Sequence, residues 1–593
     1  MTTNPEELSQ PKAEAADGSW PRWWVWSLVL TALLAGFGLR FLCFSCPPYD
    51  IHSFRQTQTL STIEDFHAHG IDLLHPKTLY MGDPGVFVLE LPVFQALAAL
   101  GYDCFGPHWE VVRSVNILFG ILTAWILFKI TDFFLGRTTA LITVLIYWLA
   151  PLHIFYHRST IMDPMAVFFA LTAFYSLTRF LFERDFTPRA KAGEPGWRVF
   201  TIFVIATWLV AMIKTLYLWP AVLLFAKAAL DRKFKPDSRM LKVLAVFAVS
   251  GFCFLAWNRY AAWINKQSPF TGGIDPTSLL GSSQLFTADF YKLVGPRTKW
   301  WVGGVGALLY PIGLWAAWTQ QRDRVRAALL WLIILVPPSY ILCFANINRP
   351  HDYYQLIITP FLAVVPAMGL QWLASRFLSN PREEHRRSTI KWLALGLGFL
   401  FCFVALPLVW WKMHNPANPT KHLLFYFLPP VYFLLFAAVS FSPRGLNPAR
   451  RATLRRTILA GVSGFLVLVS VLLYLIWMRP DLDAPLLKLQ ALCAGKVTPG
   501  KTAMVFVGEE TGGLHDSDLP HFIYATRLWG FGRSVTDMTM ARQWFEKLGP
   551  AFPKLEYILF YGTRYPDWVP EQQFRLTVRD DQDQFYVFQR TTD

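Results

Sequence analysis

Eleven residues near the N-terminus bring together the groups that acid–base chemistry requires. The segment Tyr49–Thr59 contains the carboxylate of Asp50, the imidazole of His52 and the guanidinium of Arg55 among several hydroxyl and amide side chains. It directly follows the first long apolar run of the chain. A solvated loop acid would explain Asp50 alone. A chain of apolar segments does not need the whole cluster in order to fold, so we predict that the cluster acts on a substrate.

Two further carboxylates lie in short polar segments between apolar runs. Glu90 is predicted to lie on a helix along the membrane interface, and Asp163 directly precedes Pro164. Proline is favoured at the first position of a helix and aspartate directly before it, so Asp163 can be a helix cap. A structural ion pair would likewise explain Glu90. The other interpretation is functional, because charges near a membrane are costly and often belong to a site.

Basic side chains that suit a phosphate lie on the side of the membrane to which we assign these acids. Arginine binds phosphate through two parallel hydrogen bonds, and lysine acts as a point charge. Each of these side chains could instead extend to the interface from the end of a span. The candidates are Arg55, Arg158, Lys214, Arg297 and Arg349.

The segment His351–Gln355 adds polar aromatic residues at the start of a predicted span. An interfacial belt of aromatic residues would explain Tyr353 and Tyr354 alone. It does not explain their combination with His351. We therefore count these three residues, together with His52, among the predicted substrate-binding residues.

No motif indicates a cofactor. The sequence has no Walker motif, no glycine-rich dinucleotide loop and no Gly-x-Ser-x-Gly elbow. His52, His153 and His157 could bind a divalent metal with a neighbouring acid, but no spacing resembles a zinc signature. A divalent metal therefore stays an open alternative, and no cofactor is predicted as certain.

The composition is that of an integral membrane protein. Of the 593 residues, 54% are hydrophobic and only 16% are charged. Soluble domains carry roughly 25% charged residues. The net charge of +15 is distributed over short clusters between apolar runs, which argues against a compact surface for nucleic acid.

Apolar runs of about 20 residues predict about thirteen transmembrane helices. Every second loop between them is rich in Arg and Lys, so we predict that these loops and the N-terminus are cytoplasmic. The two runs on either side of Lys214 are the hardest to separate, because this charge falls at their junction. The predicted spans are 23–45, 111–131, 138–156, 164–182, 198–214, 216–230, 241–263, 301–319, 327–346, 354–375, 391–411, 423–441 and 457–477.

Three regions follow from this pattern. Residues 1–22 are polar and predict a disordered cytoplasmic tail. Residues 23–477 form the transmembrane domain, whose long first outer loop, 46–110, is predicted to contain helices at 54–69 and 88–100. Residues 478–593 predict a small α/β domain outside the membrane. Its strands are expected at 502–507, 556–561, 574–578 and 584–589, and its helices at 520–528 and 536–548.

The seven cysteines show no metal-ligand spacing. Cys46, Cys104 and Cys493 could meet outside the membrane, but connectivity does not follow from sequence. Unpaired thiols are the favoured interpretation.

In the order of these motifs the chain resembles the polytopic GT-C glycosyltransferases. Within them it is most similar to the dolichyl-phosphate-mannose protein mannosyltransferases and the aminoarabinose transferases. The resemblance covers about residues 23–400 and rests on Asp50 with His52-Ser53-Phe54-Arg55-Gln56, Glu90-Leu91-Pro92, Arg158 with Asp163-Pro164, and His351-Asp352-Tyr353-Tyr354.

The resemblance implies roles for three acids. Asp50 corresponds to a first-loop acid that acts as a base or positions the acceptor, and Asp163 to a second acid at the start of a span. We predict that both are catalytic, with Asp50 as the first candidate for the general base of an acceptor hydroxyl. Glu90 corresponds to the acid of a Glu-Lys-Pro segment, with Leu91 in place of the lysine. Ile51 follows Asp50 where many relatives have a second acid.

We therefore predict a glycosyltransferase, either hexosyl or pentosyl, in a bacterial inner (plasma) membrane. Its donor would be a polyprenyl-phosphate sugar, and its acceptor a lipid, glycan or protein on the outer face; membrane lipids are partners and nucleic acid is not. The resemblance implies inversion at the anomeric carbon. The alternative is a polytopic transporter or lipid flippase. Transporters tend to show internal repeats and broken helices at the midplane, whereas here the charges gather at one face.

Overall fold

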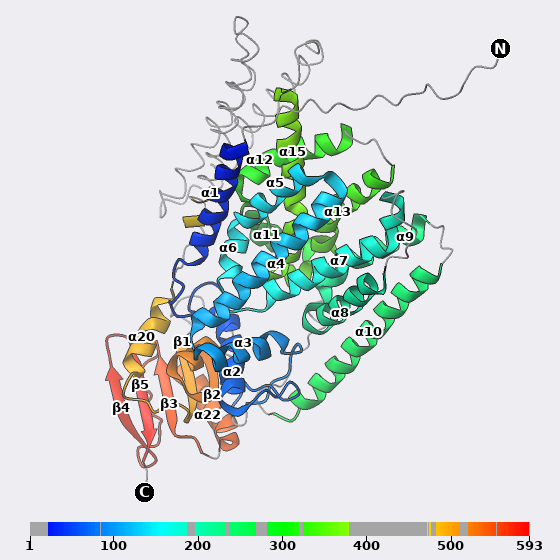
Figure 1. The fold of residues 1–593 in the computed structure, drawn as a ribbon. Coiled ribbons are helices and arrows are strands. Elements are labelled where there is room, and N and C mark those ends of the chain that lie inside the picture. Colours follow the sequence, from blue (N-terminus) through cyan, green and yellow to red (C-terminus); the bar gives the residue numbers. More distant parts are fainter. Residues whose placement is uncertain are drawn as a thin grey trace, which may run out of the picture.

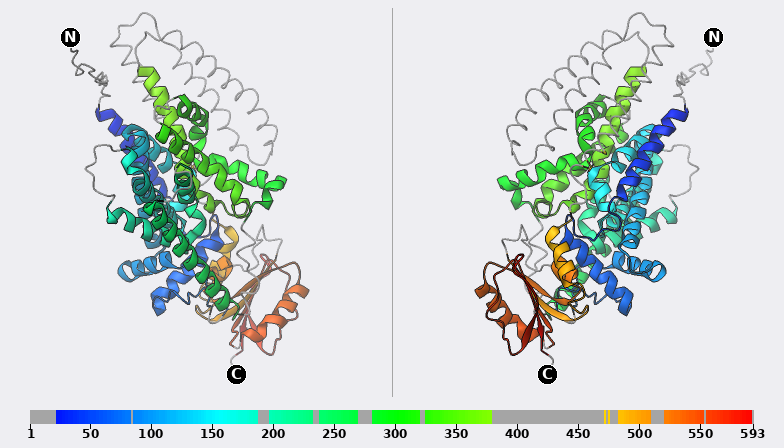
Figure 2. Two further views of the ribbon diagram at one scale, coloured as in Figure 1. Left: turned by 90° about the vertical axis from the view of Figure 1, so that its right-hand side faces the viewer. Right: turned by 90° about the vertical axis from the view of Figure 1, so that its left-hand side faces the viewer.

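The structure is a computed structural model that describes residues 22–82, 85–186, 196–231, 237–268, 281–319, 324–378, 471, 474–475, 482–508, 520–552 and 554–591. A body of α-helices occupies most of it, and a small sheet lies at one end of this body (Figure 1). The sheet is on the side of helices α2 and α3 and far from the start of α1, as the turned views also show (Figure 2). A helical membrane protein with a small C-terminal α/β unit is thus confirmed.

Five helical runs of the described chain are long and apolar enough to cross a membrane. Each has a mean hydropathy of at least 1.6 over its best 18-residue window, so composition alone favours a lipid environment. These runs are Trp109–Leu135 in α4, Asp163–Phe182 in α7 (Asp163–Phe186), Trp197–Asp231, Ser238–Asn265 in α10 and Asp352–Leu373.

The run Trp197–Asp231 has 35 residues and contains both predicted spans around Lys214. The structure divides it into α8 (Trp197–Lys214), a short 3-10 helix η1 (Thr215–Leu218) and α9 (Trp219–Asp231). Lys214 ends α8, so the charge that divides the apolar pattern also lies at the break between the helices.

The predicted span 138–156 is bent. It consists of α5 (Arg137–Trp148) and α6 (Pro151–His157), whose axes differ by 66°. Pro151 lacks the N–H that would continue α5, and a proline also disfavours helical dihedrals at the residue before it. Ala150 accordingly has φ −65° and ψ 128°. The predicted span is thus broken rather than continuous, and the bend brings the end of α6 into the site described below.

The remaining predicted spans agree in part. The first ends at Arg40 rather than at residue 45, and residues 391–411 and 423–441 lie outside the described part of the chain. Only 471, 474 and 475 of the last span are described. The other helices of the body are α1 (Arg22–Arg40), α11 (Ala288–Trp301), α12 (Gly303–Thr319), α13 (Arg324–Cys343), α14 (Ala345–Asn348) and α15 (Thr359–Leu378), with 3-10 helices η3 (Ser283–Phe286) and η4 (Asp352–Ile358).

The first outer loop contains α2 (Ser53–His69) and α3 (Val93–Phe105). Between them a short antiparallel bridge pairs Lys77 with Val86. The prediction that Glu90 lies on a helix was wrong, because α3 begins only after Pro92. A proline biases the residue before it towards extended dihedrals, so the chain before Pro92 does not form a helix.

The C-terminal unit is a five-stranded mixed sheet in the order β2-β1-β3-β5-β4. Strand β1 is parallel to β2 and β3, and β5 is antiparallel to β3 and β4. Every residue of β1 after its first is buried, as expected for a central strand. The elements are α20 (Ala484–Cys493), β1 (Thr502–Gly508), α21 (Pro520–Thr526), β2 (Trp529–Val535), α22 (Met538–Leu548), η8 (Gly549–Ala551), β3 (Tyr557–Tyr561), β4 (Phe574–Asp580) and β5 (Phe585–Arg590).

Strand β2 was not predicted from the sequence. Gly530 and Gly532 lower its apparent strand propensity. A Cβ atom at Gly530 would lie 2.0 Å from the Ala503 carbonyl oxygen, so the close approach of β2 to β1 requires glycine there.

The sheet is joined to the first outer loop by main-chain hydrogen bonds. Gly82 N donates to Gly530 O at 3.0 Å, and Gly530 N donates to Leu79 O at 2.7 Å. Asp483 N, at the start of α20, donates to Tyr49 O at 2.6 Å. The C-terminal unit thus holds the residue next to Asp50.

One disulfide corrects the sequence prediction. Cys43 and Cys46 are bonded to each other, although unpaired thiols were favoured. Of the other cysteines proposed to meet, Cys104 is free and exposed and Cys493 is free and buried.

Candidate active site

Asp50 is the acid of a buried ion pair at the start of the first outer loop. Arg158 Nη2 donates to Asp50 Oδ2 at 3.0 Å, and Gln56 Nε2 donates to Asp50 Oδ1 at 2.5 Å. Arg158 also donates from Nε to Tyr474 OH at 2.8 Å. The two charged side chains are 1% and 3% exposed. Both oxygens of Asp50 are therefore engaged by neighbouring side chains.

Asp163 differs from Asp50 because one of its oxygens is open. Tyr217 OH donates to Asp163 Oδ1 at 2.8 Å, and Lys214 Nζ lies 3.8 Å from the same oxygen. Oδ2 is buried without a hydrogen-bond partner among the described residues. The side chain thus does not act as a helix cap in this part of the structure. A buried carboxylate oxygen without a partner is costly, so this atom is a candidate to face a substrate.

Lys214 lies between two carboxylates at the end of α8. Its Nζ is 3.9 Å from Glu90 Oε1 and 3.8 Å from Asp163 Oδ1, and it donates to Tyr354 OH at 3.2 Å. The ammonium also lies 5.2 Å and 4.3 Å from the ring centroids of Tyr353 and Tyr354. An ammonium has three N–H donors. Within the described chain, one hydrogen bond uses one of them, so two donors are available to an anion.

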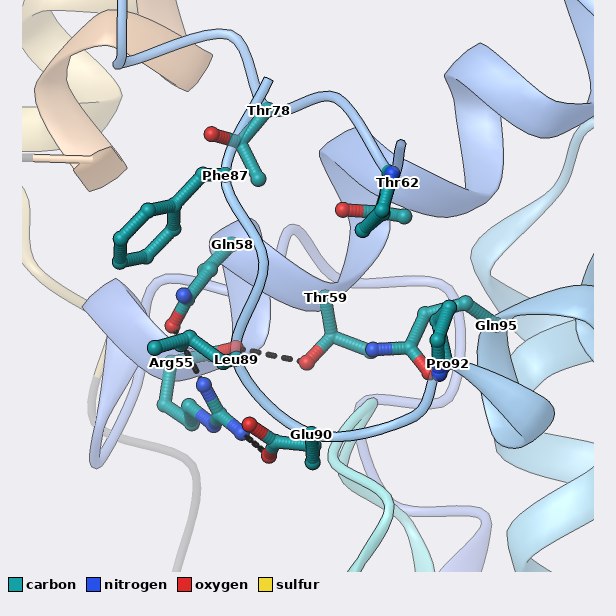
Figure 3. A pocket seen from close by; sticks show the side chains of 11 residues that line it. Arg55, Gln58, Thr59, Thr62, Thr78, Phe87, Leu89, Glu90, Pro92 and Gln95 are labelled. Atoms are coloured by element: carbon teal, nitrogen blue, oxygen red, sulfur yellow. Dashed lines mark hydrogen bonds and ion pairs between the residues drawn. The ribbon is translucent and has the colours of Figure 1, made fainter. Parts of the chain in front are cut away.

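Arg55 and Glu90 form a second ion pair beside Lys214, between the Arg55 Nη2 and Glu90 Oε1 atoms. The Arg55 guanidinium lies between Glu90 and Gln58, to which it donates from Nη1 at 2.7 Å (Figure 3). These side chains line a cavity of about 20 Å³ between α2, α3 and the loop that joins them. Arg55 Nε is buried without a partner among the described residues. A cationic donor next to Lys214 is thus unused.

His52 is held by a buried carboxylate from a distant part of the chain. His52 Nε2 lies 2.6 Å from Asp352 Oδ1, and Tyr156 OH donates to the same oxygen. The His52 side chain is 16% exposed and that of Asp352 is 5% exposed. The imidazole therefore separates the carboxylate from the open part of the site.

The rings of His52, His351 and Tyr353 contact one another and connect the acids with the cations. The Tyr353 ring lies 5.1 Å from His52 and 5.0 Å, stacked, from His351. Burial, and then the positive charges of His52, Lys214 and Arg55, lower the pKa of His351 to about 3. His351 is therefore neutral near pH 7 and packs as an aromatic ring. Tyr353 O also accepts from Tyr217 OH at 2.8 Å, which links it to Asp163.

Arg297 lies at the edge of this arrangement. Its Nη1 donates to Asn348 O at 2.8 Å, and its side chain is partly exposed. Arg349 Nη2 lies 3.7 Å from Asp289 Oδ2, with both side chains more exposed than those of the inner site. Of the predicted cations, Arg55, Arg158 and Lys214 are thus the buried ones.

The structure brings most of the predicted residues into two adjoining groups. One contains Asp50 and Arg158, and the other contains Arg55, Glu90, Asp163, Lys214, Tyr353 and Tyr354. His52 and His351 contact the second group through Tyr353. Gln56, Tyr156, Tyr217 and Asp352 also contribute, although sequence reasoning assigned them no role. Asp352 could have been noticed, since it is the acid of the segment that opens with His351.

Among the described residues no group of three or more His, Cys, Asp or Glu side chains could hold a metal ion. His153 and His157, considered as metal ligands from the sequence, are fully buried near Arg40 and Tyr147 instead. The metal alternative gains no support from this part of the chain.

Comparisons with known proteins show which family and which folds the chain is similar to. A model of the family "dolichyl-phosphate-mannose-protein mannosyltransferase" matches residues 102–265. The crystal structure of ArnT from Cupriavidus metallidurans in the apo state has 16% identity and a TM-score of 0.55, with 96% of this chain and 98% of ArnT covered. The structure of the same protein bound to undecaprenyl phosphate gives 16% identity, a TM-score of 0.56 and the same coverage.

The chain has a GT-C fold. At 16% identity the likeness to ArnT shows the GT-C fold alone, and the family model covers about a quarter of the chain. An oligosaccharyltransferase from Archaeoglobus fulgidus is also similar, at 12% identity and a TM-score of 0.48, over 91% of this chain and 70% of its own. No curated protein sequence matches the chain.

Proposed function

We propose that this GT-C protein is a multi-pass membrane glycosyltransferase. It moves a sugar from a polyprenyl-phosphate donor to a lipid, glycan or protein acceptor at the outer face of the membrane. The family model and the fold support transfer of this kind, and a solved ArnT structure contains undecaprenyl phosphate. Neither comparison favours a transporter or flippase.

The proposal rests on two cations, Lys214 and Arg55, that have free hydrogen-bond donors in the described chain. They lie beside Asp163, one of whose carboxylate oxygens has no partner there. In the described chain, Lys214 makes one hydrogen bond and has carboxylate oxygens only at 3.8 and 3.9 Å, so two of its N–H donors make no hydrogen bond, and Arg55 Nε is buried without a partner. Hydrogen bonds from these donors would stabilise the negative charge that develops on the departing phosphate. The open oxygen of Asp163 would face the positive charge that develops at the anomeric carbon in glycosyl transfer.

The resemblance allows two roles for Asp50, that of a base and that of a group that positions the acceptor. We assign it the second role. Its oxygens are engaged by Gln56 and Arg158, which leaves less room for a substrate hydroxyl than an open carboxylate would. The ion pair instead ties the turn before α2 to the end of α6. The predicted substrate-binding roles of Glu90, Arg297, His351, Tyr353 and Tyr354 fit their places around this centre.

The topology is part of the same proposal. We expect about thirteen spans, a cytoplasmic tail at 1–22, a transmembrane domain at 23–477 and an extracytoplasmic domain at 478–593. The alternation of basic loops supports this orientation. A bacterial inner membrane is the proposed location, and inversion is the proposed stereochemical outcome.

The first test uses purified protein in lipid with a panel of polyprenyl-phosphate sugars, and it measures release of polyprenyl phosphate. Wild-type protein should release it in the presence of an acceptor. Lys214→Met and Asp163→Asn should each lower kcat by roughly 10²–10³, the range for removal of one electrostatic stabiliser. Lys227→Met is the matched control, because Lys227 contacts only Asp231 on the exposed face of α9 in the described structure. Equal rates for Lys214→Met and Lys227→Met would contradict the proposed site.

A further inference from the structure

The proposed reaction leaves open which group takes the proton of the acceptor hydroxyl. Asp50 is engaged on both oxygens. Lys214 lies next to Asp163 Oδ1, and the proposed function assigns the other oxygen of Asp163 to the anomeric carbon. Each carboxylate therefore already has another role. A general base needs a lone pair that a substrate hydroxyl can reach.

His52 has an unusual backbone conformation. It directly precedes α2 with φ 56° and ψ 40°, in the left-handed region. Residues with a Cβ atom adopt this region at an energetic cost and often do so at functional sites. The His52 carbonyl oxygen accepts from Arg55 N at 2.9 Å and from Gln56 N at 3.0 Å, which holds this turn in place. The turn presents the imidazole to residues some 300 positions away in sequence.

The contact with Asp352 fixes the orientation of the imidazole. Asp352 Oδ1 lies 2.6 Å from His52 Nε2 and also accepts from Tyr156 OH, which is fully buried. When the carboxylate accepts a hydrogen bond from Nε2–H, the lone pair of the neutral imidazole is on Nδ1. In the described structure Nδ1 makes no hydrogen bond and is not among the buried atoms that lack a partner. This nitrogen is thus available to a ligand.

The rings around His52 place it at the edge of the site. Its ring centroid lies 5.1 Å from that of Tyr353, whose own centroid is 5.2 Å from Lys214 Nζ. One aromatic ring thus separates the imidazole from the ammonium proposed to receive the phosphate. A sugar whose phosphate binds Lys214 would therefore lie close to the imidazole.

We propose that His52, oriented by Asp352, is the general base that activates the acceptor hydroxyl. This inference rests on the proposed function. In the step, the acceptor oxygen forms a bond to the anomeric carbon while the bond from this carbon to the phosphate oxygen breaks. The hydroxyl proton moves to Nδ1 of His52, polyprenyl phosphate leaves with the bonding electrons, and the imidazolium later returns its proton to water. Asp352 is a positioning residue whose negative charge stabilises the imidazolium.

Titratable side chains face His52 from several elements. Tyr156 faces it from α6, Tyr353 from η4 and His351 from the segment before η4. His351 is neutral above a pKa of about 3.

The test compares pH profiles of kcat/KM for sugar transfer to the acceptor. For wild-type protein we expect the rate to rise with pH through the range of an imidazole, because only the neutral form accepts a proton. His52→Gln should lower kcat by roughly 10²–10⁴ and should remove this rising limb. Asp352→Asn should keep the limb but move it to lower pH, because the anion that favours the imidazolium is gone.

A histidine near the other end of α2 provides a matched control. His67 Nδ1 lies 2.6 Å from Asp103 Oδ1, so it forms the same type of pair at the same distance, near the other end of the helix. His67→Gln should leave the profile unchanged. Folding of each variant is checked by binding of polyprenyl phosphate, which the proposed base does not contact.

The outcomes separate the two proposals. If wild-type protein releases no polyprenyl phosphate from any donor, the proposed function and this inference both fail. If wild-type protein transfers sugar and His52→Gln retains the rising limb or full kcat, this inference alone is wrong. A limb near the range of ordinary carboxylates, at about 4, would assign the base to Asp50 or Asp163 instead.

Discussion

At the scale of single residues, the site consists of paired charges, and the Asp50–Arg158 pair is the most deeply buried. Removing one partner of a buried pair leaves an uncompensated charge and typically costs about 3–5 kcal/mol. We therefore expect Arg158→Met to lower the free energy of unfolding by about that amount. Thermal unfolding of the purified protein in detergent would show it as a lower midpoint.

The double variant tells this electrostatic explanation apart from a loss of packing. Asp50→Asn in the Arg158→Met background removes the unpaired charge, so much of the stability should return, although transfer would remain impaired. Arg542→Met is the control, because its pair with Glu546 is 60% exposed and such pairs contribute little. If Arg158→Met and Arg542→Met unfold alike, the buried pair does not stabilise the turn before α2.

At this scale the sequence predicted residue types better than their partners. The cluster Asp50–Arg55 and the acids Glu90 and Asp163 were recognised because charges near apolar runs are costly. The pairs Asp50–Arg158 and Arg55–Glu90 join segments that are tens of residues or more apart in the sequence. Local patterns do not encode these distances. His52 was expected only to bind substrate, since its left-handed turn and its contact with Asp352 appear only in the fold.

At the scale of elements, helix α2 connects the site with the C-terminal sheet. Its Glu64 accepts from Arg527 Nη1 at 2.9 and 2.8 Å and from Tyr524 OH at 2.5 Å. Tyr524 belongs to α21 and also accepts from Trp109 Nε1 at 3.2 Å. The same helix begins directly after His52. The C-terminal unit therefore holds the far end of the element that positions the proposed base.

We expect loss of this contact to reduce transfer without unfolding the sheet. If the ion pair contributes about 1 kcal/mol to the placement of α2, Glu64→Gln should lower kcat about fivefold. Arg527→Met should act similarly, and the double variant should be no slower than either single variant, because one contact is lost in each case. Lys501→Met breaks the Lys501–Glu556 pair within the C-terminal unit and serves as control. Additive losses in the double variant would show that the two side chains act separately.

Elements with a strong periodic or apolar pattern were predicted well, and interruptions were not. Strands β1, β3, β4 and β5 and helix α22 lie within about two residues of their predicted positions. Strand β2 was missed because its glycines are explained only by the neighbouring β1. The bend before Pro151 and the start of α3 after Pro92 were missed for a different reason. A hydropathy window averages over a proline and shows no interruption there, whereas the proline interrupts the helix itself.

At the scale of the whole molecule, the docked sheet lies at the same end of the helical body as α2, which begins directly after His52 (Figures 1 and 2). Main-chain bonds from Gly530 to the first outer loop and from Asp483 to Tyr49 leave the sheet on the side of α2 and α3. The orientation of the first loop therefore determines that of the C-terminal unit. One accessibility measurement can test the proposed topology of both.

Cys104 provides this measurement, since it is free and exposed near the end of α3. A membrane-impermeant maleimide added to intact cells should label Cys104, and Cys104→Ser should remove this label. A cysteine introduced by Ser238→Cys, at the exposed start of α10, should react only after the membrane is opened, because its loop is one of the basic ones. Cys253, Cys343 and Cys402 are replaced by serine in this background, so that thiols within predicted spans do not contribute. Labelling in the reverse order would place the proposed active site and the C-terminal unit in the cytoplasm, where a donor presented at the outer face could not reach Lys214.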